Sequence, residues 1–367
     1  MPHRARPRDL AARPRPATPQ RPAARAPRPR WLPALAASLL LLLTQPCGAQ
    51  EIPGLRANLE RTVHELAVGI GPRHQDAPQA YSRAAARITA LLSRWGVPHE
   101  TIPVPGARNT PPIIVAHPGG PPAPPANPPA PGAPPVLDMP PPPAPLILGA
   151  HYDTVPGAPG AADNASGVAI LLETARLLHS PPRVKAWRGL PLPPPPGAVR
   201  VAFFPNEEAP NFMTTASGSV AYAALLAATP APPGRIVAVD TVGLSPRAAE
   251  TGILAALFGN GVAVGARGPS GPLARDLAAA LADRLPVDTV VTDSGGAWID
   301  RSDHTAFTSH GWQGALLTSP GVALAACVHA PCDTPDILDP RIMEKTVLGL
   351  VEFAARAPHA RAPAPGP

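Results

Sequence analysis

Short apolar runs alternate with longer amphipathic stretches along most of the chain. The short runs are rich in β-branched side chains, which is typical of buried strands. We predict strands at Thr101–Val104, Ile113–Ala116, Leu146–Ala150, Val199–Phe204, Arg235–Val239, Asp288–Thr292 and Gly314–Leu317. In the longer stretches apolar residues recur three and four positions apart, as on one face of a helix. We predict helices at Leu55–Val68, Ala80–Leu92, Ala165–Leu178, Ser219–Ala228, Leu273–Leu285 and Arg341–Ala355.

This alternation determines the expected fold class. Strands that alternate with helices are typical of a sheet with helices on both faces. We therefore predict a three-layer α/β/α sandwich around a mostly parallel, twisted sheet. Ligands of such folds bind in a crevice at the carboxyl ends of the strands, so we expect the functional site there.

Proline divides the chain into core and surface segments. The 367 residues include 59 prolines, many of them in runs. Because proline lacks a backbone donor and fixes φ, such runs favour surface segments. We therefore predict one domain over residues 50–357 with proline-rich inserts at 118–145 and 181–197, and a disordered tail over 358–367. A docking role for the inserts, read by a proline-binding protein, is the alternative.

The positive charge of the chain is confined to its N-terminal end. The formal net charge is +6, but residues 1–49 hold nine Arg and one Asp, which leaves 22 basic and 24 acidic residues in the remainder. The remainder has no basic patch interleaved with aromatic side chains. We therefore expect no nucleic-acid partner.

Residues 1–49 have the character of a targeting segment. An Arg-rich stretch is followed by an apolar run from Trp31 to Leu43 and then by small residues before Gln50, as in a signal peptide. The run is shorter than the roughly 20 apolar residues of a membrane span. We expect an exported protein, periplasmic or secreted, with no stable membrane span after cleavage. An uncleaved anchor or a wrongly assigned start are the alternatives.

The three cysteines bear on compartment and on chemistry. Cys47 lies in the leader, where the preceding Pro46 fits a lipidation site poorly. Cys327 and Cys332 flank His329, and such a pair can close a disulfide in an oxidising compartment. A zinc-thiolate site would need further soft ligands nearby, which the sequence lacks. A disulfide or two free thiols are the expected states.

Acidic and imidazole side chains follow three of the predicted strands. They are His151 and Asp153 after the third strand, Glu207 and Glu208 after the fourth, and Asp240 after the fifth. Adjacent carboxylates at the end of a buried strand are costly unless a cation neutralises them, so this pattern favours a metal. One glutamate can then bind the ion while the other takes a proton. Asp153 is placed to accept the second imidazole N–H of His151.

Two further candidates complete a possible ligand set. Asp163 and Asn164 precede an apolar helix, where either can cap the helix or the carboxylate can bridge two ions. His329 follows another apolar stretch. Two zinc ions sharing one carboxylate need five nitrogen and oxygen ligands. The candidates are His151, Asp163, Glu208, Asp240 and His329.

In their order, these motifs resemble a known enzyme family. The chain contains, in turn, His-x-Asp, Gly-x-x-Asp-Asn-x-Ser-Gly, Asn-Glu-Glu, strand-Asp and His-x-x-x-Asp-Thr. This order is similar to that of the zinc peptidase family of bacterial leucyl aminopeptidases, glutamate carboxypeptidase II and glutaminyl cyclases. The similarity extends over roughly residues 55–355.

A further loop resembles the same family. Ser302, Asp303 and His304 match the start of its Ser-Asp-His-x-Pro-Phe loop, although Ala306 stands where proline is usual. Three contiguous side chains diverge, so they are not expected to form a catalytic triad among themselves. We expect them to shape the substrate pocket.

The resemblance implies a role for each candidate. It implies two zinc ions per chain that share one carboxylate. The implied ligands are His151, Asp163 and Asp240 for one ion and Asp163, Glu208 and His329 for the other. Glu207 is the implied general base, acting on a water that bridges the ions, and Asp153 is the implied partner of His151.

The implied activity is removal of N-terminal residues from peptides, as in an aminopeptidase. A glutaminyl cyclase is the nearest alternative, but those enzymes usually carry an acidic pair where this chain has Ser302 and Asp303. A catalytically silent, receptor-like protein is a second alternative, and it is disfavoured because all five ligands are present. Related carboxypeptidases insert a dimerisation domain, for which the sequence after Glu208 leaves little room.

Overall fold

The structure, a computed structural model, describes the part of the chain in which strands and helices were expected. The described residues are 52–121, 144–181, 194, 197–245, 261–293, 298–322 and 326–356. They belong to one compact unit. The expected leader at 1–49, most of both proline-rich inserts and the tail at 358–367 lie outside them. No helix in the described ranges is long and apolar enough to cross a membrane.

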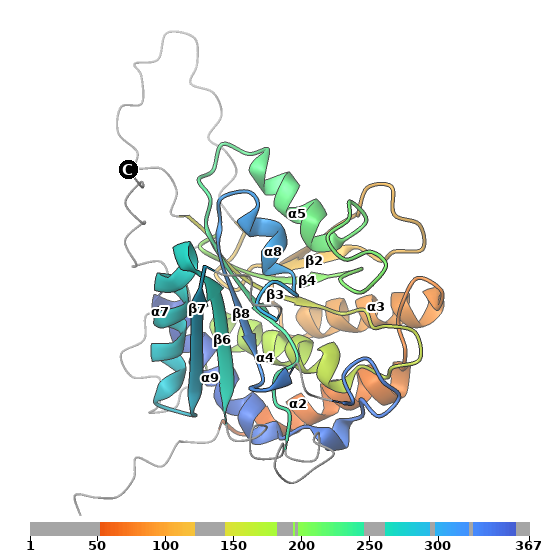
Figure 1. The fold of residues 1–367 in the computed structure, drawn as a ribbon. Coiled ribbons are helices and arrows are strands. Elements are labelled where there is room, and N and C mark those ends of the chain that lie inside the picture. Colours follow the sequence, from red (N-terminus) through yellow and green to blue (C-terminus); the bar gives the residue numbers. More distant parts are fainter. Residues whose placement is uncertain are drawn as a thin grey trace, which may run out of the picture. The chain divides into compact units, whose positions relative to one another are not determined.

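An eight-stranded mixed sheet forms the centre of this unit, in the order β1-β2-β4-β3-β5-β8-β6-β7 (Figure 1). The strands are β1 (His99–Ile102), β2 (Ile113–Ala116), β3 (Leu146–His151), β4 (Val199–Phe204), β5 (Arg235–Val239), β6 (Val262–Arg267), β7 (Val287–Thr292) and β8 (Gln313–Thr318). The central strands β4, β3, β5 and β8 are parallel. The pairs β1–β2, β2–β4 and β6–β8 are antiparallel. The carboxyl ends of β3, β4 and β5 therefore meet at one edge.

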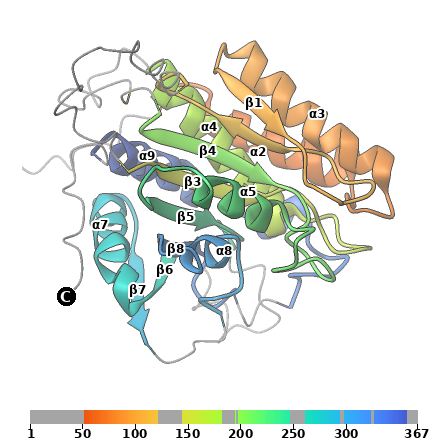
Figure 2. The ribbon, with the colours of Figure 1, turned by 90° about the horizontal axis from the view of Figure 1, so that it is seen from above.

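Helices cover both faces of the sheet, as Figures 1 and 2 show. They are α2 (Leu55–His64), α3 (Pro78–Arg94), α4 (Gly167–His179), α5 (Gly218–Ala227), α7 (Gly271–Ala282), α8 (His304–Thr308) and α9 (Pro340–Arg356). Helices α2, α3, α4, α7 and α9 share one hydrophobic core with one face of the sheet, and α5 and α8 pack on the other face. The predicted three-layer α/β/α architecture is confirmed.

The strand β3 explains why the sequence shows continuous apolar runs rather than alternation. All six of its residues are buried, since helices cover both sides. A Cβ atom at Gly149 would lie 2.7 Å from the ring of Phe204 on β4, so glycine is what allows this ring to lie against β3. The register pairs His151 with Phe204 and so aligns the carboxyl ends of the two strands.

The strand β6 is absent from the sequence prediction. Gly265 stands in its middle, and an interior glycine lowers the strand signal of a short run. The structure gives this glycine a packing role, because a Cβ atom there would lie 2.7 Å from the indole of Trp298. The space beside Gly265 is thus filled by the indole ring of Trp298.

Several predicted boundaries differ from the observed ones by one to four residues, among them those of the first strand and the first helix. The strand expected at Thr101–Val104 lies at His99–Ile102, because its pairing with β2 begins where His99 faces Ala116. The helix expected over Leu55–Val68 ends as an α-helix at His64 and continues as a wider π-helical turn.

Candidate metal centre

The predicted ligands meet at the carboxyl ends of β3, β4 and β5. They form two overlapping groups, His151 with Asp163 and Asp240, and Asp163 with Glu208 and His329, with the ligand atoms of each group within 4.8 Å of one another. His151 Nε2 lies 3.0 Å from Asp163 Oδ1 and 3.6 Å from Asp240 Oδ1. His329 Nε2 lies 2.9 Å from Asp163 Oδ2 and 3.3 Å from Glu208 Oε2. The two oxygens of Asp163 thus face different histidines.

Asp153 fixes the turn that follows β4. Its two carboxylate oxygens accept the backbone N–H groups of Glu207, at 3.1 Å, and of Glu208, at 3.0 Å. Asp153 Oδ1 is also 3.5 Å from His151 Nδ1. This contact does not have hydrogen-bond geometry, and no described residue gives either ring nitrogen of His151 a hydrogen bond. Asp153 therefore lies beside His151 without the expected hydrogen bond to its ring, and its carboxylate holds the glutamate pair.

In the turn before α4, Asn164 and Asp163 have different roles. Asn164 Oδ1 accepts the N–H of Gly167, the first residue of α4, and Asn164 Nδ2 donates to the carbonyl of Val239, each at 2.9 Å. The helix-capping function considered for Asp163 or Asn164 therefore belongs to Asn164. The carboxylate of Asp163 is left facing the two histidines.

Three non-glycine residues with left-handed backbone lie in or beside the cluster. They are Asn206 at φ 59°, Thr241 at φ 53° and His329 at φ 64°. Each such conformation costs on the order of 1–3 kcal/mol and persists only where the surroundings enforce it. At Asn206 the enforcement comes from Tyr81, whose hydroxyl accepts the Asn206 N–H at 2.7 Å and donates to Asn206 Oδ1 at 3.1 Å. The turn that presents the glutamate pair is thus held from α3.

A buried cation beside the cluster has no counterpart in the sequence prediction. Arg73 is fully buried, and its guanidinium donates to the backbone carbonyls of Tyr152, Pro159 and Gly160 at 2.7–2.8 Å. These carbonyls belong to the loop that joins β3 to the turn carrying Asp163. Burial lowers the pKa of Arg73 to about 10, which leaves it charged at neutral pH. Because the acceptors of Arg73 are backbone carbonyls, no sequence motif predicts these hydrogen bonds.

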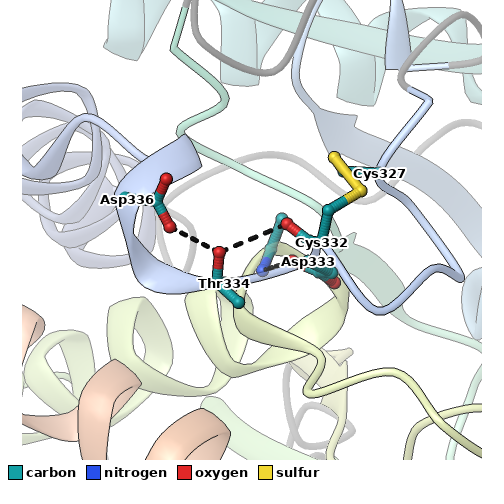
Figure 3. The surroundings of a disulfide bond; sticks show 6 residues. Cys327, Cys332, Asp333, Thr334 and Asp336 are labelled. Atoms are coloured by element: carbon teal, nitrogen blue, oxygen red, sulfur yellow. Dashed lines mark hydrogen bonds between the residues drawn. A yellow bond between two sulfur atoms is a disulfide. The ribbon is translucent and has the colours of Figure 1, made fainter.

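The segment that carries His329 is closed by a disulfide. Cys327 and Cys332 are bonded, with their Cα atoms 5.1 Å apart (Figure 3). The next residue, Asp333, accepts the N–H of Ala162 at 2.6 Å and that of Asp163 at 3.1 Å. His329 is the exposed member of the cluster, with 55% of its side chain accessible. The segment is thus tied both to itself and to the turn carrying Asp163.

The electrostatics of the cluster are dominated by buried carboxylates. Burial raises the pKa of Glu208 to about 7, with a contribution from Asp163, and raises the pKa of Glu207 well above its usual range. Burial alone would lower the pKa of His151, but Glu207 and Asp240 reverse this and raise it well above its ordinary value. Contacts with Asp163 and Glu208 raise the pKa of His329 to about 10. The two histidines therefore do not fully neutralise the negative charge of the buried carboxylates.

The donor set fits two divalent cations. His151 Nε2 and Glu208 Oε1 are buried and have no hydrogen-bond partner among the described residues. Imidazole nitrogens and carboxylate oxygens are the ligands that zinc accepts in catalytic sites. A cation at each group would neutralise the buried carboxylates and use the unpaired atoms.

A cavity of about 350 Å³ opens over the cluster. Beyond the cluster, its described walls include Phe212, Trp298, Arg301, Leu316, Val322 and Val328. The volume is at the lower end of that of small-ligand sites. Ser302, Asp303 and His304, which were expected to shape this pocket, are buried and are not among the described lining residues. Burial raises the pKa of Asp303 to about 7.

Comparison of the sequence with known proteins gives a family match. The family described as Peptidase family M28 matches residues 137–354, more than half of the chain. The uncharacterized protein YfbL of Escherichia coli (strain K12) is 28% identical over 314 residues, which are 80% of this chain and 85% of YfbL. The predicted ligands and Glu207 all lie within the matched region.

Solved structures share the fold. BSAP, a zinc aminopeptidase from Bacillus subtilis, superposes with a TM-score of 0.56 at 15% identity, over 84% of this chain and 96% of that chain. A glutaminyl cyclase of Bacteroides thetaiotaomicron superposes with the same TM-score of 0.56 at 15% identity, over 82% and 97%. At these identities the likeness concerns the fold and does not separate hydrolysis from cyclisation.

Proposed function

This chain belongs to peptidase family M28, and we propose that it is a two-zinc aminopeptidase that removes N-terminal residues from peptides. The observation that carries the proposal is that Asp163 belongs to two ligand groups of three residues each. One group is His151, Asp163 and Asp240, and the other is Asp163, Glu208 and His329. The family supports peptide hydrolysis, and the ligand geometry supports two ions.

In this proposal, different residues bind the metal ions, transfer the proton and position the base. Zinc ions held by the two groups would supply Lewis-acid polarisation of water and of the scissile carbonyl. Glu207 is buried beside both groups, with Oε2 3.9 Å from His151 Nε2, and takes the proton from the attacking water. It then gives that proton to the leaving amine. Asp153 keeps Glu207 in place by accepting its backbone N–H.

The carboxylate-rich cluster also suits an N-terminal substrate. A peptide bound with its free α-amino group beside the cluster would gain a polar contact that an internal peptide bond lacks. Cleavage would then be restricted to the first residue. N-blocked peptides are the matching negative control.

The substitution Glu207→Gln tests the proposal. It removes the base but leaves both ligand groups, so we expect about two zinc ions per chain and a 10²–10⁴-fold loss of kcat. Metal analysis and hydrolysis of aminoacyl arylamides measure the two effects on one preparation. Glu60→Gln, an exposed residue of α2, serves as the control. Wild-type activity in Glu207→Gln, or wild-type protein without stoichiometric metal, would refute the mechanism.

Glutaminyl cyclisation is the second candidate, because a cyclase shares the fold. The presence of two ligand groups favours hydrolysis, since cyclases typically use one zinc. A peptide with N-terminal glutamine distinguishes the two activities. Release of ammonia with the peptide bond intact indicates cyclisation, and release of free glutamine indicates hydrolysis.

The disulfide supports export of the protein. Disulfides persist mainly in oxidising compartments, and Cys327 and Cys332 are bonded. We therefore propose that the chain acts outside the cytoplasm after removal of residues 1–49. Fractionation followed by N-terminal sequencing tests this, with a mature N-terminus near Gln50 as the expected result.

A further inference from the structure

The cavity over the metal centre carries one charge that catalysis does not use. The other charged residues among its described walls are the candidate ligands and Glu207. Arg301 is the remaining charged residue of the described lining, and it is exposed. A cation at this place distinguishes substrates by charge without taking part in bond cleavage.

The backbone around Arg301 is fixed by buried neighbours. Ile299 and Ser302, on either side, are essentially inaccessible to solvent. Trp298 packs directly on the backbone of β6, where the absence of a side chain at Gly265 leaves room for its indole. Arg301, an exposed residue of the cavity lining, therefore stands between buried residues of the chain.

The charge of Arg301 is not neutralised by its neighbours. Asp300, the adjacent acid, is engaged by Arg267, whose Nε donates to Asp300 Oδ1 at 2.9 Å and whose Nη2 contacts Oδ2. The backbone carbonyl of Asp293 also accepts from Arg267. Across the described parts of the chain no residue forms an ion pair or hydrogen bond with Arg301. Its donors remain available to a ligand.

We propose that Arg301 binds a carboxylate of the peptide substrate, so that the enzyme prefers anionic substrates. The proposal rests on the peptidase function proposed above. A planar guanidinium matches a carboxylate through paired N–H donors. Two carboxylates can reach the cavity, the side chain of an N-terminal acidic residue or the C-terminus of a short peptide. Trp298 and Leu316, which line the same cavity, suit the aliphatic part of either substrate.

Two pairs of substrates separate these sources. Glutamyl and glutaminyl arylamides differ in side-chain charge but little in size, and leucylglycine differs from its C-terminal amide in terminal charge. We expect the zinc-loaded enzyme to have the higher kcat/KM for the anionic member of one pair. In Arg301→Met that preference should fall on the order of tenfold, because a partly exposed charge-assisted contact is lost. The pair that shows the fall identifies the carboxylate.

A charge reversal and a control sharpen the test. Arg301→Glu should invert the selectivity and favour lysyl over glutamyl arylamide. Arg94→Met, an exposed arginine of α3 away from the cavity, should keep the wild-type ratio. If neutral substrates are cleaved but both ratios are the same in wild type and Arg301→Met, the carboxylate proposal is wrong and the peptidase function stands.

Absence of all hydrolysis would instead refute the proposed function, and binding then decides the role of Arg301. Calorimetry with glutamate against glutamine, and with leucylglycine against its C-terminal amide, measures the charge preference without turnover. A preference for the anionic member of either pair that is lost in Arg301→Met supports the proposal. Equal affinities within both pairs, in wild type and in Arg301→Met, refute it.

Discussion

Arg73 is a cation placed beside a site that is built to attract cations. The repulsion is offset because Asp153, Asp163 and Asp333 all stabilise its charge, and because its donors are matched to backbone carbonyls. Unlike the candidate ligands, Arg73 is itself a cation and does not bind a metal. At the residue scale, Arg73 holds the loop before Asp163 through the carbonyls of Pro159 and Gly160.

We therefore expect Arg73→Met to lower the free energy of unfolding by about 3 kcal/mol or more, because several buried carbonyls lose their donors. Zinc affinity should fall as well, since the loop loosens. Arg73→Lys keeps the charge with fewer donors and should recover part of both losses. Urea unfolding and chelator competition measure the two effects, with Arg94→Met as the exposed control. Wild-type stability and affinity in Arg73→Met would contradict this assignment.

At the scale of structural elements, the short segment that carries His329 is held by two kinds of contact. The disulfide between Cys327 and Cys332 closes a short loop (Figure 3), and His329 lies within that loop. Asp333 ties the segment to the turn before α4. Without the disulfide, the segment keeps only its hydrogen bonds, while His329 itself is exposed and has left-handed backbone. In the proposed two-zinc site, the group of Asp163, Glu208 and His329 includes a ligand from this segment, and the group of His151, Asp163 and Asp240 does not.

The double substitution Cys327→Ser and Cys332→Ser should therefore weaken one zinc site selectively. We expect about tenfold lower affinity for one ion, as for other changes in residues that orient a ligand, with the other ion retained. Titration with a graded chelator, followed by metal analysis, resolves the two sites. Equal loss of both ions, or no loss, would show that the disulfide does not position His329.

The same elements show what the sequence could and could not predict. The strands β3, β4 and β5 were predictable because buried apolar runs end in charged residues, and so was the meeting of those residues. The left-handed backbone at Asn206 was not, because contacts with Tyr81, 125 positions away, impose it. Arg73 was missed because backbone carbonyls leave no motif. Arg301 was missed because cavity walls depend on loop packing.

For the molecule as a whole, the unbalanced carboxylates make stability depend on pH. The folded-state pKa values of Glu208 and Asp303, about 7, and of Asp333, about 6, lie above their ordinary values, chiefly through burial. The folded chain therefore binds these protons more tightly than the unfolded chain does. Their stabilising contribution is complete below about pH 4 and is lost as pH rises towards 7.

Protein stripped of metal by a chelator should therefore have a lower Tm at pH 7.5 than at pH 5. Zinc should raise Tm most at pH 7.5, where the ligands are deprotonated and the ions replace the missing protons. Thermal unfolding at both pH values, with and without zinc, measures this. A Tm of the stripped protein that rises between pH 5 and 7.5 would mean that the buried carboxylates do not control its stability.

The contacts of Arg73 and Tyr81 also set a limit on how this protein can be divided. Both residues lie before position 137, where the match to the family begins, yet they hold the loops that present Asp163 and Glu207. A fragment cut at the family boundary would keep every candidate ligand and lose the donors that arrange them. Gene fusions and domain exchanges with relatives should therefore carry the helices α2 and α3 together with the matched region.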